Sequence, residues 1–219
     1  TDQCMMWPKD ENGEWVEPFN PMHDGRAYFT ENNAYIFNWD VKHDLEGLFT
    51  LMGGHEKAEA KLDELFHMGV GTAKFRFYNV LPDATGLMGM FQMGNEPSFH
   101  IPYLYDYVGA PWKTQKYIHS LIDTYFIDSY LGMPGDEDGG GMSAFVVFSM
   151  MGFFPVTPGT TTYAIGSPFF EKATLHLPNG KSFIIKAKEI SKENKFIQSA
   201  RLNGQPLTKP FLTHEQLMS

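Results

Sequence analysis

Three consecutive carboxylates stand in a glycine-rich turn, Gly135–Gly141, and an almost wholly apolar run, Met142–Met151, follows at once. A helix that is apolar nearly all round is expected to be buried, so the turn before it should lie at the edge of a buried element. Three adjacent acids at such an edge repel one another unless a cation or a substrate neutralises them. The alternative is an ordinary acidic turn in contact with solvent.

Most of the chain before residue 160 shows helical periodicity. Apolar residues recur at three- and four-residue spacing after Glu31, and Gly53-Gly54 ends that pattern. Residues 68–93 read as a long irregular link. Helices are expected over residues 31–52, 55–67, 96–108, 112–125 and 142–151. Helices that come in pairs with long loops between the pairs indicate an α/α barrel, or part of one.

The pattern changes near residue 160. Residues 174–177 and 182–187 alternate as strands do, with the hairpin signal Asn179-Gly180 between them. A second hairpin is expected around Asn203-Gly204. The predicted fold is therefore mainly α with a β C-terminal segment. Its predicted parts are residues 1–160, the later part of a barrel, and residues 161–219, a β-strand segment.

Composition excludes several classes of protein. The chain has 219 residues and a net charge of −9 with dispersed basic residues, which argues against a nucleic-acid-binding protein. It contains no apolar run long enough for a membrane span. The single cysteine, Cys4, excludes an internal disulfide. Aromatic residues make up 15%, which suits either a large core or a sugar-stacking cleft.

Two further turns carry acids at predicted helix starts. Glu31 is either an ordinary first-turn acid or one of two carboxylates that flank a scissile glycosidic bond, with Asp136–Asp138 as the partner group. Asn95 and Glu96 suit a hard cation or sugar hydroxyls, although Asn95 also fits a helix cap before Pro97. His43, Asp44 and His100 are candidate polar lining of the same site.

These motifs occur together and in order along the chain, and they resemble glycoside hydrolase family 92, the calcium-dependent exo-acting α-mannosidases. The resemblance extends over essentially the whole chain. The segments that carry it are Trp-Val-Glu-Pro-Phe-Asn-Pro (15–21), Tyr-Phe-Thr-Glu-Asn-Asn-Ala-Tyr (28–35), His-Asp (43–44), Leu-Met-Gly-Gly (51–54), Gly-Asn-Glu-Pro-Ser-Phe-His (94–100), Gly-Ala-Pro-Trp-Lys-Thr-Gln (109–115), Gly-Asp-Glu-Asp-Gly-Gly-Gly-Met-Ser-Ala (135–144), Gly-Phe-Phe-Pro-Val-Thr-Pro-Gly (152–159) and Gly-Ser-Pro-Phe-Phe (166–170).

The resemblance implies an inverting exo-α-mannosidase that removes mannose from α-mannosides such as N-glycans. It implies Glu31 as general acid, and Asp138 with Asp136 as the general base and its helper. It implies a Ca²⁺ ion that binds the mannose, for which Asn95 and Glu96 are the expected metal residues. The expected substrate-binding residues are Asn33, His43, Asp44, Glu96 and His100.

The resemblance also implies a fold and a location. The family has a six-hairpin α/α barrel preceded by a β-sandwich domain, so this chain is expected to be a C-terminal fragment. An open barrel would need that domain or self-association to cover it, and the fragment alone is expected to lack parts that activity needs. The implied location is periplasmic, secreted or on the cell surface of a bacterium.

Departures from the family pattern leave the linkage preference open. Met93 and Phe99 stand where the family commonly has histidines, Gly141 where glutamine is frequent, and Phe145 where tryptophan is. Two alternatives follow: a catalytically impaired mannose-binding relative, and a glycosidase or phosphorylase of different sugar specificity on a similar barrel. Binding without hydrolysis would indicate the first, and dependence on phosphate would indicate a phosphorylase.

Overall fold

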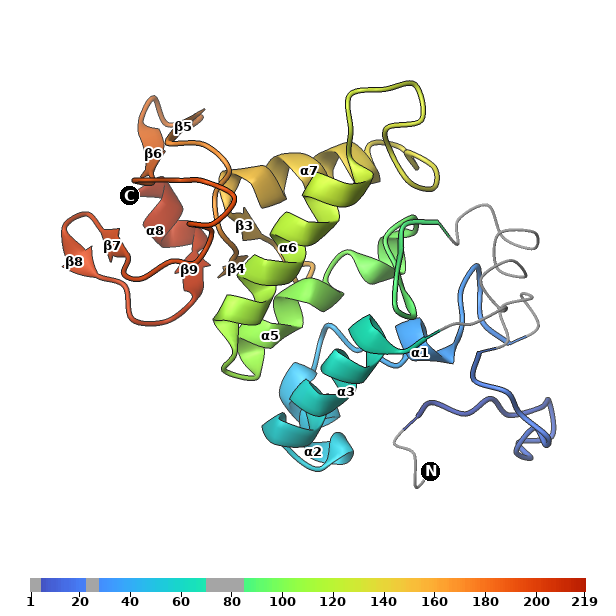
Figure 1. The fold of residues 1–219 in the computed structure, drawn as a ribbon. Coiled ribbons are helices and arrows are strands. Elements are labelled where there is room, and N and C mark those ends of the chain that lie inside the picture. Colours follow the sequence, from blue (N-terminus) through green and yellow to red (C-terminus); the bar gives the residue numbers. More distant parts are fainter. Residues whose placement is uncertain (1–4, 23–27, 70–84) are drawn as a thin grey trace. The chain divides into compact units, whose positions relative to one another are not determined.

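The structure is a computed structural model that describes residues 5–22, 28–69 and 85–219 (Figure 1). Much of the predicted irregular link, residues 70–84, lies outside these ranges. The chain divides into two compact units. The first runs up to Phe99 and includes Asp128–Asp138, and the second consists of His100–Ile127 and Gly139–Ser219. As predicted, the described residues form helices followed by a C-terminal strand segment.

The first unit opens with three helices, α1 (Ala34–Phe37), α2 (Leu45–Met52) and α3 (His55–His67). The prediction for α3 is confirmed, but the single helix expected over residues 31–52 is wrong. Asn33 caps a four-residue helix, and Asp44 caps a second one after an intervening turn. The apolar spacing continues across that break, so periodicity alone gave no sign of it. Gly53, at φ 96°, ends α2 in a left-handed cap.

A short hairpin completes the first unit. Strands β1 (Leu87–Met88) and β2 (Phe91–Gln92) pair antiparallel, and the 3₁₀-helix η1 (Glu96–Ser98) follows. A Cβ on Gly89, in the hairpin turn, would lie 2.5 Å from the Leu65 carbonyl oxygen of α3, so glycine allows the hairpin to approach that helix. The helix α1 packs against both β2 and η1. This packing brings the segment after Thr30 close to the segment after Gln92.

The second unit contains the longer helices. The elements in chain order are η2 (Ile101–Tyr103), α5 (Leu104–Tyr107), α6 (Pro111–Tyr125) and α7 (Gly141–Met151). The predictions for α6 and α7 are confirmed. The continuous helix predicted over residues 96–108 is wrong, because η1, η2 and α5 divide it. Pro97 and Pro102 lie in the first turns of the two 3₁₀-helices, where a proline that lacks an N–H can begin a helix but not continue one.

The burial predicted for α7 holds for only part of that helix. Met142 and Phe145 are almost fully buried, whereas Val147 is 56% exposed. The helix therefore presents one apolar side to the second unit's interior and leaves another apolar side chain open.

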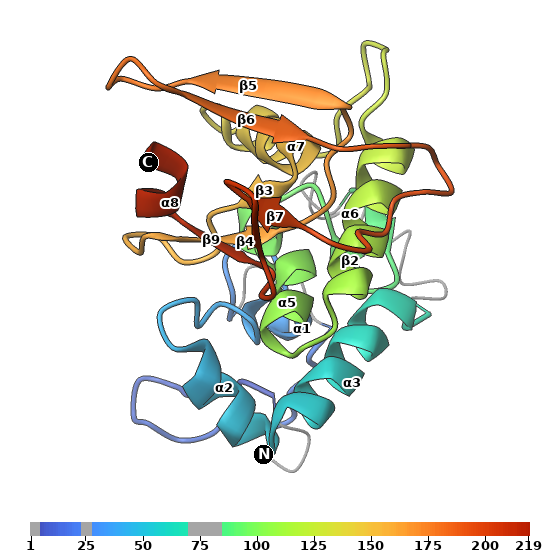
Figure 2. The same cartoon turned by 90° about the vertical axis from the view of Figure 1, so that its left-hand side faces the viewer.

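Short antiparallel strands follow α7 (Figure 2). Both predicted hairpins are confirmed, at Asn179-Gly180 and at Asn203-Gly204. A three-stranded sheet in the order β3-β4-β9 was not predicted, since its strands are short and distant in sequence. The bounds are β3 (Phe153–Phe154), β4 (Thr162–Ile165), β5 (Lys172–His176), β6 (Ser182–Lys186), β7 (Arg201–Leu202), β8 (Gln205–Pro206), β9 (Phe211–Thr213) and the last helix α8 (His214–Met218).

The strand segment has its own apolar cluster. Phe153, Leu212 and Leu217 form its buried centre, and Leu175 and Phe183 from the β5–β6 hairpin pack against it. Exposed and half-buried residues alternate along β5 and β6, which is the pattern of a sheet with one face on a core.

Candidate functional site

The acidic turn is anchored by Gly135, which no other residue type could replace without moving the backbone. Gly135 has φ 65°, and a Cβ at this position would lie 1.9 Å from the carbonyl oxygen of Gly94. The Gly135 backbone N–H also donates a hydrogen bond to Thr85 Oγ1, at 2.6 Å. These contacts hold Asp136–Asp138 beside the segment that continues into Asn95 and Glu96.

Three carboxyl groups meet at this point. The pKa of Glu96 is raised, first by burial, although its own backbone N–H opposes the shift. A hydrogen bond with Asp138, the negative charge of Asp138 and that of Glu31 raise this pKa further. The structure thus brings together Glu31, Glu96 and Asp138, which come from three separate parts of the sequence.

Two of these acids sit in left-handed backbone conformations. Glu31 has φ 61° and Asp138 has φ 49°, and only two other non-glycine residues in the described ranges have positive φ. Such conformations cost roughly 1–3 kcal/mol each and concentrate at functional sites. The backbone is therefore strained at both positions that the sequence assigned to acid and base catalysis.

Asn95 connects the acids and carries an unused acceptor. Its Nδ2 makes long contacts with the backbone oxygen of Glu31, at 3.4 Å, and with Glu31 Oε2, at 3.5 Å. Asn95 stands at the N-cap position of η1 and Pro97 lies in its first turn, as the capping alternative predicts, but the Asn95 side chain makes no capping hydrogen bond. Its Oδ1 is buried and has no hydrogen-bond partner among the described residues.

Two further buried amides, which the sequence analysis missed, lie next to these residues in the chain. Asn32 and Gln92 are both 0% exposed, and Asn32 Nδ2 and both polar atoms of the Gln92 side chain lack a partner within the described ranges. Buried polar groups without partners are costly and call for a ligand or water. The sequence signal was their position beside the Glu31 and Gly-Asn-Glu-Pro motifs. Asn33, by contrast, uses its Oδ1 to accept from the Tyr35 N–H.

The oxygen donors suit a hard cation, although those among the described residues would not by themselves complete its coordination. Asn95 Oδ1 has free acceptor capacity and Glu96 supplies a carboxyl group beside it. In the ranges that the structure describes, no group of three His, Cys, Asp or Glu side chains is arranged to hold a metal ion. Calcium takes 6–8 oxygen ligands and accepts amide, carboxylate, water and sugar oxygens. The described donors therefore fit calcium provided that further oxygen atoms complete its coordination.

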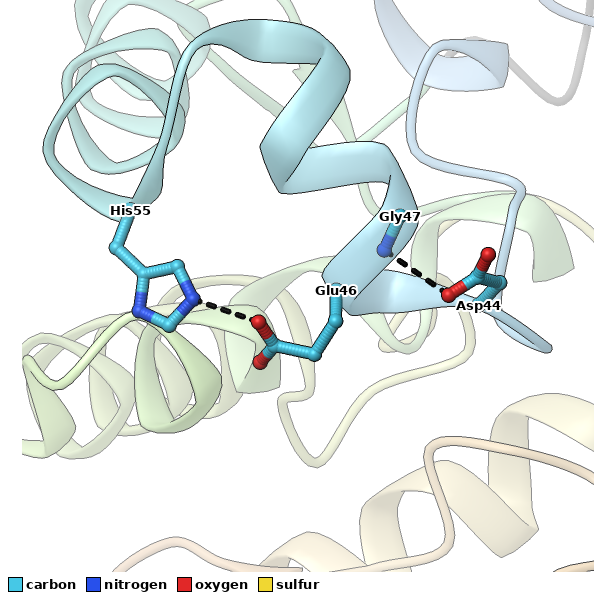
Figure 3. A network of polar contacts seen from close by, with 4 residues as sticks. All are labelled: Asp44, Glu46, Gly47 and His55. Carbon is cyan, nitrogen blue, oxygen red and sulfur yellow. Dashed lines mark hydrogen bonds and ion pairs between the residues drawn. The ribbon is translucent and has the colours of Figure 1, made fainter.

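The other predicted residues have distinct surroundings. Asp44 is the N-cap of α2, where its Oδ1 accepts a hydrogen bond from the Gly47 N–H at 2.9 Å (Figure 3). The neighbouring ion pair joins Glu46 to His55 at 2.9 Å. His43 and Asp136 are exposed. His100 is 2% exposed and belongs to the second unit.

The family model described as "Glycosyl hydrolase family 92 catalytic domain" matches residues 1–219, the whole chain. The chain belongs to glycoside hydrolase family 92. A protein of Arthroderma benhamiae named "Uncharacterized secreted glycosidase" is 36% identical, and the alignment spans 95% of this chain and 26% of that protein. The chain thus spans about a quarter of the length of this curated relative.

Two solved structures from Bacteroides thetaiotaomicron share the fold of this family 92 chain. The family 92 α-mannosidase BT3965, in complex with mannoimidazole, has a TM-score of 0.87 and 32% identity, over 97% of this chain and 28% of its own. The family 92 inverting mannosidase BT2199 has a TM-score of 0.82 and 42% identity, over 97% of this chain and 29% of its own.

Proposed function

We propose that this family 92 chain carries the catalytic carboxyl groups of an inverting, calcium-assisted exo-α-mannosidase. The observation that carries the proposal is the meeting of Glu31, Glu96 and Asp138. The sugar and the stereochemistry of the proposal come from two structural neighbours, since BT3965 is an α-mannosidase and BT2199 is an inverting mannosidase.

In the proposed reaction, Glu31 in its protonated form gives its proton to the glycosidic oxygen as the bond to the anomeric carbon breaks. Asp138, with Asp136 as helper, takes a proton from a water molecule, whose oxygen attacks the anomeric carbon from the opposite face. The products are β-mannose and the shortened glycan. Inverting pairs stand about 6.5–9.5 Å apart to leave room for this water. Adjacent residues could span such a gap, because Asn95 contacts Glu31 and Glu96 hydrogen-bonds Asp138.

Substrate and cation would share the polar surroundings of these acids. We assign Asn33, His43, Asp44, Glu96 and His100 to binding of the terminal sugar, and Asn95 and Glu96 to Ca²⁺. The ion would supply positive charge among acidic groups and oxygen coordination for the sugar hydroxyls. The unpartnered Asn95 Oδ1 supports this assignment.

The wider architecture is also part of the proposal. We place residues 1–160 in the later part of an α/α barrel and residues 161–219 in a strand segment that packs on an N-terminal β-sandwich. The two helices α2 and α3, joined through Gly53-Gly54, support a helical hairpin. We propose a periplasmic, secreted or cell-surface bacterial enzyme that acts on N-glycans. The relative named as secreted supports the secreted location. Among the described residues, no helix combines the length and apolar character that crossing a bilayer requires.

The decisive test is Glu31→Gln in the full-length protein. Hydrolysis of α-linked mannobioses should fall by about 10²–10⁴-fold, because the leaving oxygen loses its proton donor. An aryl mannoside with an activated leaving group should be affected far less. Glu137→Gln, which alters an acid of the same turn without an assigned role, is the matched control.

Stereochemistry and metal dependence complete the test. Proton NMR of the wild type should show β-mannose as the first product, and a chelator should abolish its release. Near-normal mannobiose hydrolysis by Glu31→Gln would refute the assignment of the acid. Mannose binding without release would favour the impaired relative, and a requirement for phosphate would favour a phosphorylase.

A further inference from the structure

Thr85 accepts two hydrogen bonds, and each comes from a segment that carries one of the candidate carboxyl groups. Its backbone carbonyl oxygen accepts from the Gly94 N–H at 3.1 Å. Its side-chain Oγ1 accepts from the Gly135 N–H at 2.6 Å. Glu96 follows Gly94 by two residues, and Asp138 follows Gly135 by three. A threonine that lies outside the sequence motifs therefore joins the two acid-bearing segments.

The contact through the carbonyl oxygen belongs to the backbone of the β1–β2 hairpin. The Met93 N–H donates to the Gly86 carbonyl oxygen at 3.1 Å, beside the bond from Gly94 to Thr85. These two bonds keep the chain paired beyond the ends of β1 and β2, where the register pairs Leu87 with Gln92. Because backbone groups make this contact, it does not depend on the side chain at position 85.

The contact through the hydroxyl group depends on the side chain. The acidic turn approaches the hairpin where two glycines leave room. A Cβ on Gly86 would lie 3.0 Å from Pro134 Cβ, and one on Gly135 would lie too close to Gly94. Glycines permit this approach but have no side chain that could hold it. Without the Thr85 hydroxyl group, the Gly135 N–H would lose this acceptor, and a donor without a partner favours movement toward water.

Such a movement would change the spacing of the carboxyl groups. Asp138 hydrogen-bonds Glu96, which also interacts with the charge of Glu31. A catalytic group that is displaced by about 1 Å can lower the rate by about 10²-fold. The position of the candidate base therefore depends on a hydroxyl group from another part of the sequence.

We propose that Thr85 is a positioning residue for the candidate base Asp138. Its hydroxyl oxygen fixes the acidic turn and its carbonyl oxygen fixes the segment of Glu96, so the two carboxyl groups keep a constant spacing. This inference rests on the proposed function and adds to it a residue that acts through Asp138 and transfers no proton.

The test removes the hydroxyl group and keeps a side chain of similar shape. In the full-length protein, Thr85→Val should lower kcat by about 10- to 100-fold with little change in KM, because the base is displaced while the sugar still binds. The loss should be similar on a mannobiose and on an aryl α-mannoside, since both need an activated water. Thr85→Ser, which keeps the hydroxyl group, should retain the wild-type kcat. Thr160→Val is the matched control, because it removes a hydroxyl group that donates to the Thr157 carbonyl oxygen at 2.8 Å, and it should leave kcat unchanged.

Sodium azide distinguishes a displaced base from a general loss of structure. The azide ion attacks the anomeric carbon without giving up a proton, while Glu31 protonates the departing phenol, so the products are β-mannosyl azide and the phenol. Azide should therefore restore turnover of the aryl mannoside by Thr85→Val and should not accelerate the wild type. Amide hydrogen exchange of residues 133–139 should be faster in Thr85→Val than in the wild type or in Thr85→Ser.

Each other outcome overturns the positioning role. A wild-type kcat in Thr85→Val refutes it, and so does an equal loss in Thr85→Ser, because the hydroxyl group would then not be the cause. A lowered kcat that azide does not restore would assign Thr85 to stability alone. A wild type inactive on every mannoside refutes the proposed function and the positioning role with it, whereas an active wild type with unchanged exchange in Thr85→Val refutes the positioning role alone.

Discussion

Glu96 and Asp106 are two acids of the same chain whose pKa values are raised, and they differ in what surrounds them. Burial is the largest cause for both. Glu96 also faces the charges of Asp138 and Glu31 in a loop region that is partly open. Asp106, on α5, is 3% exposed, and burial, not a neighbouring acid, raises its pKa.

The interior of the second unit offers Asp106 little compensation. Thr114 and the backbone at Ile165 lie close enough to oppose the rise in the Asp106 pKa, but the Thr114 hydroxyl donates its hydrogen to the Pro102 carbonyl oxygen at 3.0 Å. Neither carboxyl oxygen of Asp106 has a partner with hydrogen-bond geometry among the described residues. Burial and the Asp106 charge together raise the pKa of Tyr107 to about 12. Nothing from solvent can relieve this acid.

The difference distinguishes a ligand-accessible acid such as Glu96 from a buried acid such as Asp106, which only lowers stability. A cluster of acids that a ligand can reach is relieved when a cation or a substrate binds, so its repulsion contributes to binding. A lone buried acid is relieved only by a proton, so its cost depends on pH alone. Substitutions in the two regions should therefore affect different properties of the protein.

The largest effect is expected at the glycine that assembles the cluster. Gly135→Ala places a methyl group 1.9 Å from the Gly94 oxygen, where ordinary contact begins at 3.4 Å. The acidic turn must then move by more than an ångström, and such a displacement can lower catalysis by about 10²-fold or more. We expect kcat/KM on mannobiose to fall at least this far.

Gly139→Ala is the matched control for this prediction. Gly139 has φ 66°, against 65° for Gly135, but has nothing within 4 Å of the position of a Cβ. Both variants carry the same backbone strain of about 1 kcal/mol. This strain should lower the melting temperature of both variants by a similar amount. If the two variants lose equal activity, the loss comes from backbone strain and not from a clash between residue 135 and Gly94.

Local signals predicted part of this fold and left out the rest. The helix α3 was predicted to the residue, because its apolar face and its polar face are both regular. The break between α1 and α2 was not predicted. Asn33 and Asp44 act as helix caps because the backbone turns between the two helices, and their residue types alone do not reveal that turn. The β3-β4-β9 sheet joins Phe153 to strands as far along the chain as Thr213, and no local pattern encodes such a pairing.

The candidate site shows the same limit. The motifs singled out Glu31, Glu96 and Asp138, but that the three meet depends on the packing of α1 on η1 and on the approach of Gly135 to Gly94. The unpartnered atoms of Gln92 and Asn32 depend on burial, which sequence does not report for polar side chains. Asp106 lies in a segment that was predicted as plain helix, so its buried carboxyl group drew no notice.

An intermediate effect is expected from neutralising each of the two acids. The pKa of Asp106 lies above its ordinary value of 3.8, so the folded state is favoured fully below that pH and loses this stability as the pH rises through the raised pKa. Asp106→Asn cannot ionise. At neutral pH the free energy of unfolding of this variant should therefore exceed that of the wild type by about 1–3 kcal/mol. The difference should shrink toward pH 4.

Glu96→Gln sharpens this comparison. Its stability gain should have the same sign and pH trend but be smaller, because Glu96 is partly exposed and solvent screens its charge. Its mannosidase activity should fall, whereas Asp106→Asn should keep the activity of the wild type. Denaturant unfolding from pH 4 to pH 8, beside kcat/KM, measures both. A stabilised, fully active Glu96→Gln would place Glu96 outside the site.

The smallest effect concerns two helix caps, one in each unit. Asp44 caps α2 through the Gly47 N–H, and Thr213 caps α8 through the Gln216 N–H at 3.2 Å. Replacing either with alanine should cost about 1 kcal/mol of unfolding free energy, and Asp44→Ser should recover most of the loss at its position. If Asp44 also binds sugar, as we propose, Asp44→Ala will raise KM for mannobiose and Asp44→Ser will not restore it, while Thr213→Ala leaves KM unchanged. An Asp44→Ala variant with normal KM and lowered stability would assign this aspartate to the helix cap alone, as its contact with Gly47 already suffices to explain its position.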